Sequence, residues 1–389
     1  MSEKIITGID IGTFQVKVVV VRVPKNKKER NLPQIIGTGY ADSKGIRNGY
    51  IVNEKEATRS VRQAVSQAEK AAGVSIKKAH ISVGGIGIEE IRSKGETVTS
   101  RADSVITQAD IEKAQQDSEE HIQDSIPNRN VLHIIPLSYH VDNQLVLGKP
   151  EGMHGVKLET ENLFITIYSQ HLKDTIQVVE GAGIDVEDVM ANPIAAGLVI
   201  VSGAQKRAGS VMANIGSETV SIVVYENNTL VSVKVFPIGS NDITNDIALG
   251  LKIPLEEAEK IKRGGMSSAP YTKKKLDEII QARLVDIFEL VDNHLKKLKR
   301  DGLLPAGVII TGGGSSIVGI QEVAKQTMSL PARVANLDTG QNVKVRSASW
   351  SVAYGLCTWA SSDPEEDNVL GITKQKRNPV WRWFSQFLP

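Results

Sequence analysis

Two short glycine turns, about 200 residues apart, carry residue types that can bind phosphate. The first is Gly8-Ile-Asp-Ile-Gly-Thr13 and the second is Ala213-Asn-Ile-Gly-Ser-Glu-Thr219, and each follows an apolar run. Glycine lets the backbone come close to an anion, so the amides of such a turn can point at phosphate oxygens. The Asp10 carboxylate could hold a magnesium-bound water. One such turn also fits an ordinary hairpin, but two of them predict a clamp that binds phosphates from both sides.

A third glycine cluster begins at Gly312. The apolar run Val308-Ile-Ile-Thr311 precedes Gly312-Gly-Gly-Ser315, and a helical pattern follows over 319–328. These glycines allow a flat ligand such as adenine to lie against the backbone. Together with the two phosphate turns, the cluster predicts a nucleotide site.

The elements that position the turns also occur twice. Residues 4–40 read as strand, tight turn, strand, charged loop and strand, and residues 211–236 repeat that pattern. Helical patterns at 57–72 and 172–183 lie between the two copies. Alternating strands and helices of this length predict an α/β layer structure in each half, so we interpret the chain as a duplication.

Each half also contains a segment that breaks the pattern. Residues 84–163 predict a mixed α+β insertion, with a helix over 107–125 that Thr107 caps. Residues 243–301 predict an all-helical insertion, whose apolar stripe ends in basic residues. Residues 361–377 are polar and non-periodic, which is typical of a linker.

Composition argues against several classes of protein. The chain has 389 residues, which is enough for two domains. Its formal net charge of +1 is too small to attract a polyanion, so no nucleic-acid partner is expected. The single cysteine, Cys357, cannot form an internal disulfide, and the N-terminus lacks signal-peptide features, which predicts an intracellular protein. No apolar run is long enough to span a membrane, and the histidines lack zinc-ligand spacing.

The last residues, 378–389, predict a short amphipathic helix. At roughly 100° per residue its apolar side chains occupy an arc of about 160°, with Arg382, Ser385 and Gln386 on the opposite side. Tryptophan and phenylalanine favour the lipid headgroup region, and the basic residues upstream strengthen binding to an anionic surface. A helix docked on the protein's own body or on a partner is the alternative. The residues predicted to enter an anionic phospholipid membrane are Val380, Trp381, Trp383, Phe384, Phe387 and Leu388.

These motifs resemble those of the actin-like ATPase superfamily and, within it, the FtsA family of bacterial cell-division proteins. The resemblance covers nearly the whole chain. It implies a duplicated actin-like (ribonuclease H-like) fold of the α/β class, with a nucleotide between two lobes. The residues that carry the resemblance are Gly8–Thr13, Gly45–Asn53, Ile81–Gly85, Pro237–Ala248, Ala258–Lys262, Thr311–Ser315 and Trp381–Leu388.

The resemblance also implies a division into subdomains. The duplicated halves correspond to subdomains 1A and 2A, the α+β insertion to 1C and the helical insertion to 2B, and Asn192-Pro193 stands where the family links its lobes. The expected bounds are 1–83 and 164–195 for 1A, 84–163 for 1C, 196–242 and 302–360 for 2A, 243–301 for 2B, 361–377 for the linker and 378–389 for the membrane-targeting helix.

Site residues follow from the resemblance position by position. ATP and Mg²⁺ are the implied cofactors, and Asp10 would hold the metal through water. Glu259 and Lys262 match a helix beside the ribose and base, although a solvated helix face would also explain them. The implied nucleotide-binding residues are Asp10, Gly12, Thr13, Asn214, Gly216, Ser217, Glu218, Thr219, Gly239, Glu259, Lys262, Gly312, Gly313, Gly314 and Ser315.

The second phosphate turn departs from the family pattern. Where the family has Asp-Ile-Gly-Gly-Gly-Thr, this chain has Asn214, Ser217 and Glu218 in place of the aspartate and two glycines. Asn214 offers no full negative charge to a magnesium-bound water, and Glu218 adds a carboxylate near the expected terminal phosphate. We therefore expect nucleotide binding with slow or absent hydrolysis, so the protein is at most a slow ATPase. The alternative is that Glu218 turns into solvent and the turn works as usual.

The implied function is mainly structural. The resemblance implies a filament-forming protein that tethers the tubulin-like protein FtsZ to the cytoplasmic face of the bacterial cell membrane at the division site. Its implied partners are the FtsZ C-terminal tail, bound through 2B, further copies of itself and other division proteins. A small-molecule kinase and a pilus-assembly adaptor stay open as alternatives. The kinase is disfavoured because the turns offer no catalytic carboxylate beyond Asp10, and neither alternative needs an aromatic tail.

Overall fold

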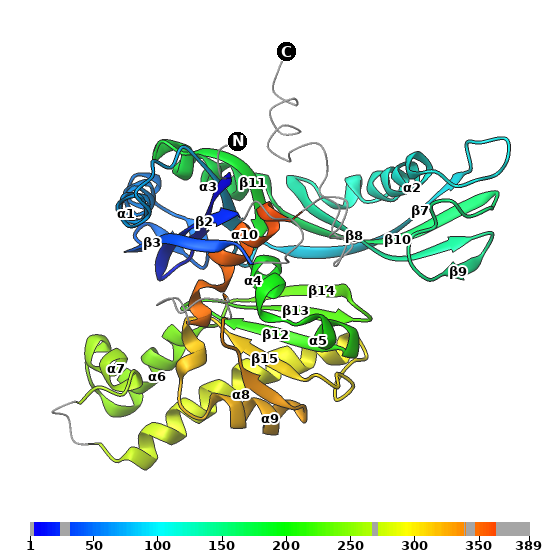
Figure 1. Ribbon diagram of the computed structural model, residues 1–389. Helices are drawn as coiled ribbons and strands as arrows, with labels where there is room; N and C mark the ends of the chain where they lie inside the picture. The colour runs from blue at the N-terminus through cyan, green and yellow to red at the C-terminus, as the bar shows by residue number, and fades with distance from the viewer. Residues whose placement is uncertain (1–3, 24–31, 267–270, 338, 340–346, 363–389) are drawn as a thin grey trace.

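The chain folds into two lobes, with an elongated insertion that extends from the first (Figure 1). The expected membrane helix at 378–389 and nearly all of the expected linker lie outside the residues that the structure describes. Of the helices in the described part, none is both long and apolar enough to cross a bilayer. The structure, a computed structural model, describes residues 4–23, 32–266, 271–337, 339 and 347–362.

Each lobe is built on a five-stranded sheet, and the two sheets share one topology. Three consecutive strands run antiparallel, and two later strands join them in parallel, giving the orders β11-β6-β1-β2-β3 and β14-β13-β12-β15-β16. The duplication predicted from the sequence is therefore confirmed. The strands are β1 (Lys4–Ile11), β2 (Gln15–Val23), β3 (Gln34–Asp42), β6 (Lys78–Val83) and β11 (Asp185–Ala191) in the first lobe, and β12 (Ser210–Ile215), β13 (Val220–Glu226), β14 (Thr229–Phe236), β15 (Val308–Thr311) and β16 (Ala332–Val334) in the second.

The first hairpin of each sheet has the same register. Asp10 lies opposite Lys17 where β1 pairs with β2, and Asn214 lies opposite Ser221 where β12 pairs with β13. A constant shift of 204 residues, from 10 to 214 and from 17 to 221, therefore relates the two hairpins. Equivalent positions in the two phosphate turns can be read directly from this shift.

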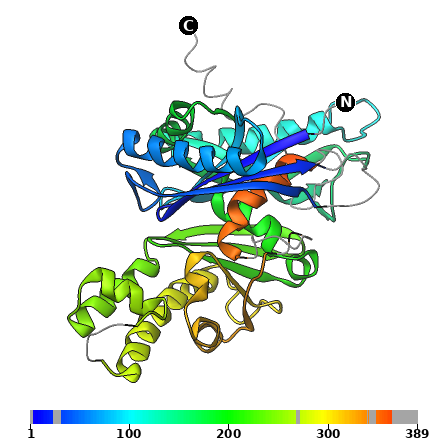
Figure 2. The ribbon, with the colours of Figure 1, turned by 60° about the vertical axis from the view of Figure 1, so that its left-hand side comes forward.

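Helices α1 (Glu54–Ala72) and α3 (Ser169–Gly181) cover the outer face of the first sheet, and Figure 2 shows α1 lying along the strands. α1 begins at Asn53, whose side chain accepts a backbone hydrogen bond, and ends at Gly73 with a left-handed φ of 68°. Its small side chains face the sheet, which allows a close approach. A Cβ on Gly39 of β3 would overlap the Ala64 carbonyl oxygen of α1.

Two helices lie between the sheets (Figure 1): α4 (Asn192–Ile200) and α10 (Ser351–Ser361). α4 contacts strands of both lobes, whereas α10 packs on α4 and on β1, β2 and β6 of the first lobe. The two helices approach closely because a Cβ on Gly355 would overlap the Ala195 carbonyl oxygen. The expected bounds place 302–360 in subdomain 2A, but the last helix of this range packs on the first-lobe sheet, with Val352 and Leu356 in a core cluster that residues of both lobes share.

The outer face of the second sheet is covered by helices, as the apolar spacing over 243–301 predicts. α6 (Ser240–Leu251), α8 (Lys273–Lys297) and α9 (Ile320–Met328) pack there, and α7 (Leu255–Lys262) packs on α6. The buried side chains of α8 lie between its middle and its C-terminal end. Its buried apolar side chains are Leu284, Ile287, Phe288, Val291 and Leu295.

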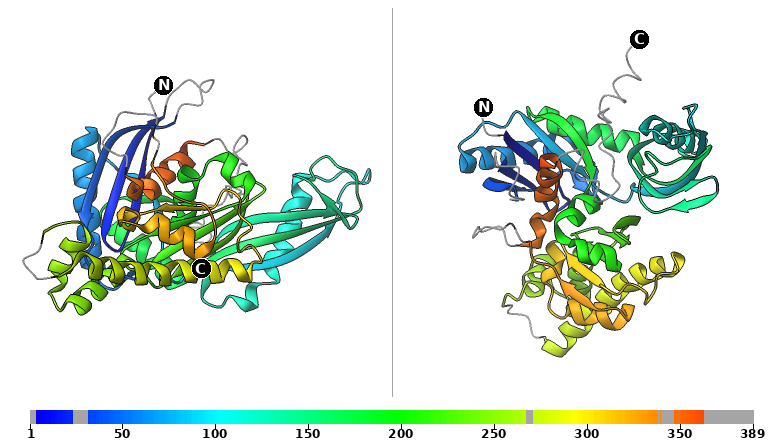
Figure 3. Two further views of the ribbon diagram at one scale, coloured as in Figure 1. Left: turned by 90° about the horizontal axis from the view of Figure 1, so that it is seen from below. Right: turned by 45° about the vertical axis from the view of Figure 1, so that its right-hand side comes forward.

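The insertion in the first lobe is a four-stranded sheet of order β7-β10-β8-β9 with α2 across it, and it extends away from both lobes (Figure 3). Thr107 caps α2, as predicted. The expected boundary at 163 falls inside β10, which still pairs with β8 at Tyr168, so the sheet of the insertion extends to that residue. The elements are β7 (Glu89–Val98), α2 (Gln108–Glu120), β8 (Arg129–Val141), β9 (Gln144–Val146) and β10 (Lys157–Tyr168).

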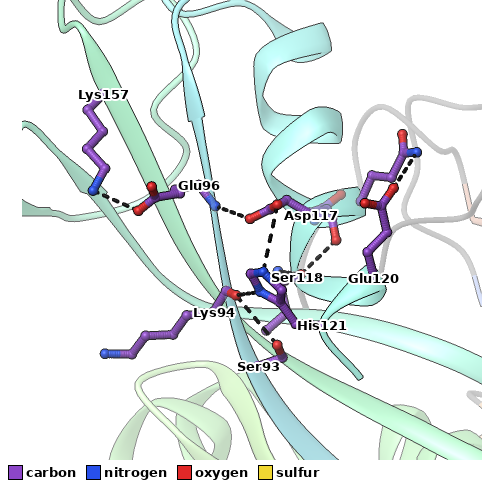
Figure 4. A network of polar contacts seen from close by, with 11 residues as sticks. Ser93, Lys94, Glu96, Asp117, Ser118, Glu120, His121 and Lys157 are labelled. Atoms are coloured by element: carbon purple, nitrogen blue, oxygen red, sulfur yellow. Dashed lines mark hydrogen bonds and ion pairs between the residues drawn. The ribbon is translucent and has the colours of Figure 1, made fainter. Parts of the chain in front are cut away.

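A polar network joins α2 to the sheet of the insertion (Figure 4). Asp117 of α2 accepts the backbone hydrogen bond of Glu96 at 2.8 Å, and Nδ1 of His121 lies 2.9 Å from the carbonyl oxygen of Lys94. Lys157 of β10 pairs with Glu96 at 2.7 Å. These contacts link the helix and two strands, so the insertion holds its own shape beside the lobes.

Candidate functional site

A cavity of about 700 Å³ lies between the lobes, where the two phosphate turns meet α7 and the third glycine cluster. Small-molecule sites in proteins usually measure roughly 300–1,000 Å³. The cavity brings together all of the predicted nucleotide-binding residues except Glu218 and Gly239. Those that line it are Asp10, Gly12, Thr13, Asn214, Gly216, Ser217, Thr219, Glu259, Lys262, Gly312, Gly313, Gly314 and Ser315.

The first hairpin places a buried carboxylate and a half-buried ammonium group at the cavity wall. Asp10 lies opposite Lys17, and the Ser82 hydroxyl donates a hydrogen bond to Asp10 Oδ1 at 3.0 Å. Burial raises the pKa of Asp10, while Lys17 and Ser82 oppose that rise. Burial lowers the pKa of Lys17, and Asp10 opposes that fall. The pair thus offers one acidic and one basic group to a ligand that contains both metal and phosphate.

The second turn repeats this backbone geometry without the charges. Asn214 and Ser221 take the places of the aspartate and the lysine. A Cβ on Gly216 would lie 2.8 Å from the Thr219 carbonyl oxygen, which is the same restriction that Gly12 meets in the first turn. The glycine is therefore required by the tight turn itself, whereas the aspartate and the lysine occur only in the first of the two hairpins.

The start of α6 supports the second turn from behind. The backbone amides of Ser240 and Asn241 donate hydrogen bonds to the carbonyl oxygens of Gly216 and Ser217, at 2.9 and 2.7 Å. Gly239, the residue before the helix, packs against the turn, where a Cβ would overlap the Ser217 carbonyl oxygen. Gly239 therefore supports the turn and does not line the cavity.

Glu259 and Lys262 of α7 form a buried ion pair with a separation of 2.6 Å. Lys262 also donates to the Ser240 carbonyl oxygen at 2.9 Å and to Thr244 Oγ1 at 2.7 Å. Burial lowers the pKa of Lys262, which Glu259 opposes. Burial alone would raise the pKa of Glu259, but hydrogen bonds from Lys262 and Thr244 outweigh that effect and lower it. The Lys262 side chain is only 6 % exposed, so a solvated helix face does not describe it.

The third glycine cluster packs its backbone against the second turn. Gly312 has a φ of 89°, and a Cβ there would overlap the Asn214 amide oxygen. A Cβ on Gly314 would lie 2.6 Å from the Ile215 side chain. Gly313 differs, because it lines the cavity and nothing lies within 4 Å of the position of its missing Cβ. The cluster thus presents one open glycine to the cavity, as expected of a surface for a flat ring.

The donor atoms at the cavity fit a magnesium ion that is held through water. Mg²⁺ commonly keeps several waters and binds one or two carboxylates together with phosphates. Asp10 supplies a carboxylate, and Oδ1 of Asn192 is buried on the same cavity without a hydrogen-bond partner in the described structure. Across the described residues no group of three or more His, Cys, Asp or Glu side chains could ligate a metal directly.

Glu218 contacts the opposite lobe. Its carboxylate accepts hydrogen bonds from Nη1 of Arg47 at 2.8 Å and from the backbone amide of Asn48 at 2.6 Å. The Glu218 side chain is 13 % exposed. The structure therefore differs from both sequence interpretations, because this carboxylate neither lines the cavity nor turns into solvent.

The sequence interpretation missed several residues at this site. Lys17 could have been found from the hairpin register, which places it opposite Asp10. The family resemblance places Asn192 only at the link between the lobes, although it also lines the cavity. No local sequence pattern indicates Phe14 and Arg263 as site residues, because they come together only across the cavity, where the first turn meets the end of α7. The Arg263 guanidinium lies 5.2 Å from the centre of the Phe14 ring.

Comparison with known families agrees with this architecture. A family model described as cell division protein FtsA matches residues 211–355, and one described as the SHS2 domain inserted in FtsA matches residues 85–166. The second match coincides with the α+β insertion of the first lobe.

Relatives of the chain in several bacteria carry the name cell division protein FtsA. The protein from Neisseria meningitidis serogroup B is 30% identical, over 94% of this chain and 94% of the relative. Those from Bacillus subtilis and Escherichia coli K12 are 29% and 26% identical, over 92% and 91% of this chain and 84% and 90% of the relatives.

Solved structures with the same fold have much lower sequence identity. A chain of the PilM–PilN type IV pilus biogenesis complex matches with a TM-score of 0.69 at 16% identity, over 92% of this chain and 99% of that chain. The ethanolamine utilization protein EutJ from Carboxydothermus hydrogenoformans matches with a TM-score of 0.54 at 16% identity, over 92% and 90%. With its two-lobed actin-like fold, its inserted SHS2 domain and its near full-length relatives, the chain belongs to the FtsA family of cell-division proteins.

Proposed function

We propose that this protein binds ATP with Mg²⁺ between its lobes and works as a filament-forming adaptor that tethers FtsZ to the cytoplasmic face of the bacterial cell membrane. The main support is the cavity of about 700 Å³, on which glycine turns from both halves of the duplicated fold converge. A ligand that spans this cavity contacts both lobes and therefore couples its occupancy to the angle between them.

The residues of the cavity would divide the work of binding between phosphates, metal and base. Lys17 and Lys262 supply positive charge at the two sides of the cavity. Asp10 and Asn192 would accept hydrogen bonds from the waters of Mg²⁺, and the metal would neutralise phosphate charge when bound. The open backbone at Gly313 would carry the adenine ring.

Slow or absent hydrolysis is part of the proposal. The second turn holds Asn214 and Ser221 where the first holds an acid and a base, so the second lobe offers no carboxylate at that place. A neutral amide binds a metal-bound water less strongly than a carboxylate does. Because Glu218 is held by the first lobe, the argument for slow turnover rests on Asn214 alone. Binding without rapid turnover suffices for a role in assembly.

Membrane attachment would come from residues 378–389, which lie outside the described structure. A single short amphipathic helix binds a membrane weakly, but a filament presents many copies at high effective concentration. We place the site for the FtsZ C-terminal tail on the helical insertion of the second lobe. Leu249 of α6 and Leu255 of α7 are exposed there, at 77 % and 57 %, which suits an apolar partner.

We propose subdomain limits that follow the packing of the structure. The insertion 1C extends to Tyr168, where β10 ends. Subdomain 2B comprises the helices α6 to α8, and α10 is assigned to 1A with the sheet on which it packs. Neither alternative role gains support, since the likeness to the pilus protein concerns the fold alone.

Recruitment of FtsZ to liposomes tests this proposal. Liposomes of anionic phospholipid, purified FtsZ and the full chain with ATP should float together, and FtsZ should remain behind when the chain is omitted. Gly313→Glu projects a charged side chain into the cavity without displacing a neighbour, so it should reduce recruitment. Gly313→Ala is the matched control and should behave as wild type. Recruitment of FtsZ that does not depend on the chain would refute the adaptor role.

A further inference from the structure

The tips of the two phosphate turns each contact an arginine of the opposite lobe. Phe14 and Glu218 occupy equivalent positions, since the shift of 204 residues that relates the hairpins carries 14 to 218. Phe14 of the first lobe lies under Arg263 at 5.2 Å, and Glu218 of the second lobe binds Arg47 at 2.8 Å. The duplicated fold thus has a reciprocal pair of contacts across the space between its lobes.

The contact between Glu218 and the first lobe is stronger than the contact between Phe14 and Arg263. An exposed ion pair contributes little, and the Arg47 side chain is 73 % exposed. The carboxylate, however, is largely excluded from solvent and also accepts the Asn48 backbone hydrogen bond at 2.6 Å. Hydrogen bonds to an ionised acceptor are stronger than neutral ones, and this one has a rigid donor.

The first-lobe turn that receives Glu218 also holds the first phosphate turn. It connects β4 (Ile46–Arg47) to β5 (Tyr50–Ile51), and its two central residues have left-handed φ angles, 49° at Asn48 and 83° at Gly49. The Asn48 amide donates to Glu218, and the next amide, of Gly49, donates to Thr13 Oγ1 at 3.2 Å. Two successive amides therefore bind side chains of the two phosphate turns.

We propose that the Glu218 carboxylate is a built-in anion that ties the second phosphate turn to the first lobe, so that the lobes remain closed without a bound terminal phosphate. Arg47 and the Asn48 amide form an anion-binding pair of donors, and Glu218 occupies it. A ligand shifts a conformational equilibrium only by its differential affinity for the two states. Because the Glu218 side chain keeps the lobes closed, ATP and ADP would bind to the same closed cavity.

The proposal has two measurable consequences, of which only the second rests on the proposed nucleotide site. In the nucleotide-free protein, loss of Glu218 should let the lobes open. In the presence of nucleotide, apparent affinity falls in proportion to the fraction of closed molecules. Glu218→Ala should therefore weaken the binding of ATP and of ADP by the same factor, which reaches about tenfold if only about one molecule in ten remains closed.

Spin-label distances in the nucleotide-free full chain provide the test. Gln63→Cys on α1 and Glu256→Cys on α7 place exposed labels on different lobes at the same side of the molecule, and the native Cys357 is buried (Figure 1). For the doubly labelled parent protein, which retains Glu218, we expect one narrow distance distribution. With Glu218→Ala, we expect a longer mean distance and a broader distribution. Glu218→Gln keeps an acceptor for the amide but loses the charge, so it should give a smaller change in the same direction.

Glu226→Ala is the matched control. Glu226 lies at the end of the same strand, β13, and pairs with Arg300 at 2.9 Å within the second lobe. Its removal should leave the distance distribution unchanged. Superimposable distributions for Glu218→Ala and its parent, or equal opening in Glu226→Ala, would overturn the proposal. So would a loss of affinity confined to ATP. If neither nucleotide binds the parent protein, the nucleotide site is wrong, but the distances still decide whether Glu218 holds the lobes together.

Discussion

Asp10 and Lys17 are direct cross-strand neighbours at the wall of the cavity between the lobes, where Asp10 is buried and Lys17 is half-buried. Each side chain is the source of opposite charge beside the other. The equivalent residues in the second hairpin, Asn214 and Ser221, are neutral. A ligand in the cavity meets the Asp10–Lys17 pair on the side of the first lobe and the ion pair that Lys262 forms within α7 on the side of the second. We expect the first hairpin to hold the metal, while Lys17 and Lys262 bind the phosphates from opposite sides.

Lys17→Met should destabilise the fold and weaken nucleotide binding together. Lys17 is the nearby cation that stabilises the buried Asp10 carboxylate, and removing one partner of a buried charge pair costs about 3 kcal/mol of unfolding free energy. Urea denaturation measures that loss, and a thermal shift with ATP measures binding. Lys44→Met removes an exposed lysine of the same lobe and serves as the control. Unchanged stability in Lys17→Met would mean that the Asp10 charge is compensated elsewhere.

ATP with Mg²⁺ should raise the unfolding temperature while phosphate release stays slow. Binding to the folded state alone stabilises it by about 2.7 kcal/mol at a hundredfold excess over Kd. Asn214→Asp restores a carboxylate to the second turn and should increase single-turnover phosphate release by about tenfold, as a charged acceptor binds more strongly than a neutral one. Brisk release by the wild type would contradict the argument from Asn214.

Truncation before Asn378 should abolish binding to anionic liposomes and leave the fold intact. Co-sedimentation measures binding, and circular dichroism checks the fold. Trp381→Glu should act like the truncation because it puts a charge on the apolar side of the predicted helix. Ser385→Glu adds the same charge to the polar side and should be far milder. Equal sedimentation of full-length and truncated protein would refute membrane attachment by this segment.

Filaments should form on a lipid monolayer with ATP and with a non-hydrolysable analogue, because binding and not turnover sets the geometry of the lobes. Gly313→Glu should reduce their number, because a blocked cavity leaves the Glu218 contact alone to hold the lobes closed, and electron microscopy would show the difference. If the wild type forms filaments without nucleotide, the outcome for Glu218→Ala becomes decisive. Nucleotide-free filaments that persist in Glu218→Ala would mean that assembly does not depend on closed lobes.

Acid should destabilise the protein through His133. This buried ring accepts the Ala191 backbone hydrogen bond at 3.1 Å, and burial lowers its pKa from 6.5 to about 4. Between these values the unfolded chain binds a proton that the folded chain does not. Stability is therefore retained above pH 6.5 and falls by about 1.4 kcal/mol for each unit below it.

Chemical denaturation at a series of pH values would measure that slope. His133→Gln keeps an acceptor for the Ala191 amide and should remove part of the slope of stability against pH. His294, whose pKa burial also lowers to about 4, should account for another part. Replacement of the exposed His154 by Gln should leave the slope as it is in wild type.

The sequence predicts those features of the fold that are local or repeated. The tight turns need glycine because a side chain at Gly12 or Gly216 would come too close to the backbone. Because the fold is duplicated, finding one turn supports the assignment of the other. The position of α10 was not predictable in this way, because an apolar helix after the second sheet could pack on either lobe. The Glu218 contact was missed for a similar reason, since its partner Arg47 is far away in sequence and lies in the other lobe.

The packing of α10 determines how tension on the C-terminal segment would enter the molecule. This helix ends at Ser361, and its Ala360 carbonyl oxygen accepts a hydrogen bond from the Lys4 ammonium at 3.2 Å, so the first and last described segments lie together on one lobe. A pull on the chain beyond residue 362 would be transmitted to β1 and its neighbours. The second lobe branches off this line, so an anchored molecule would take the load on its first lobe, and the second lobe would follow through the α4 and Glu218 contacts.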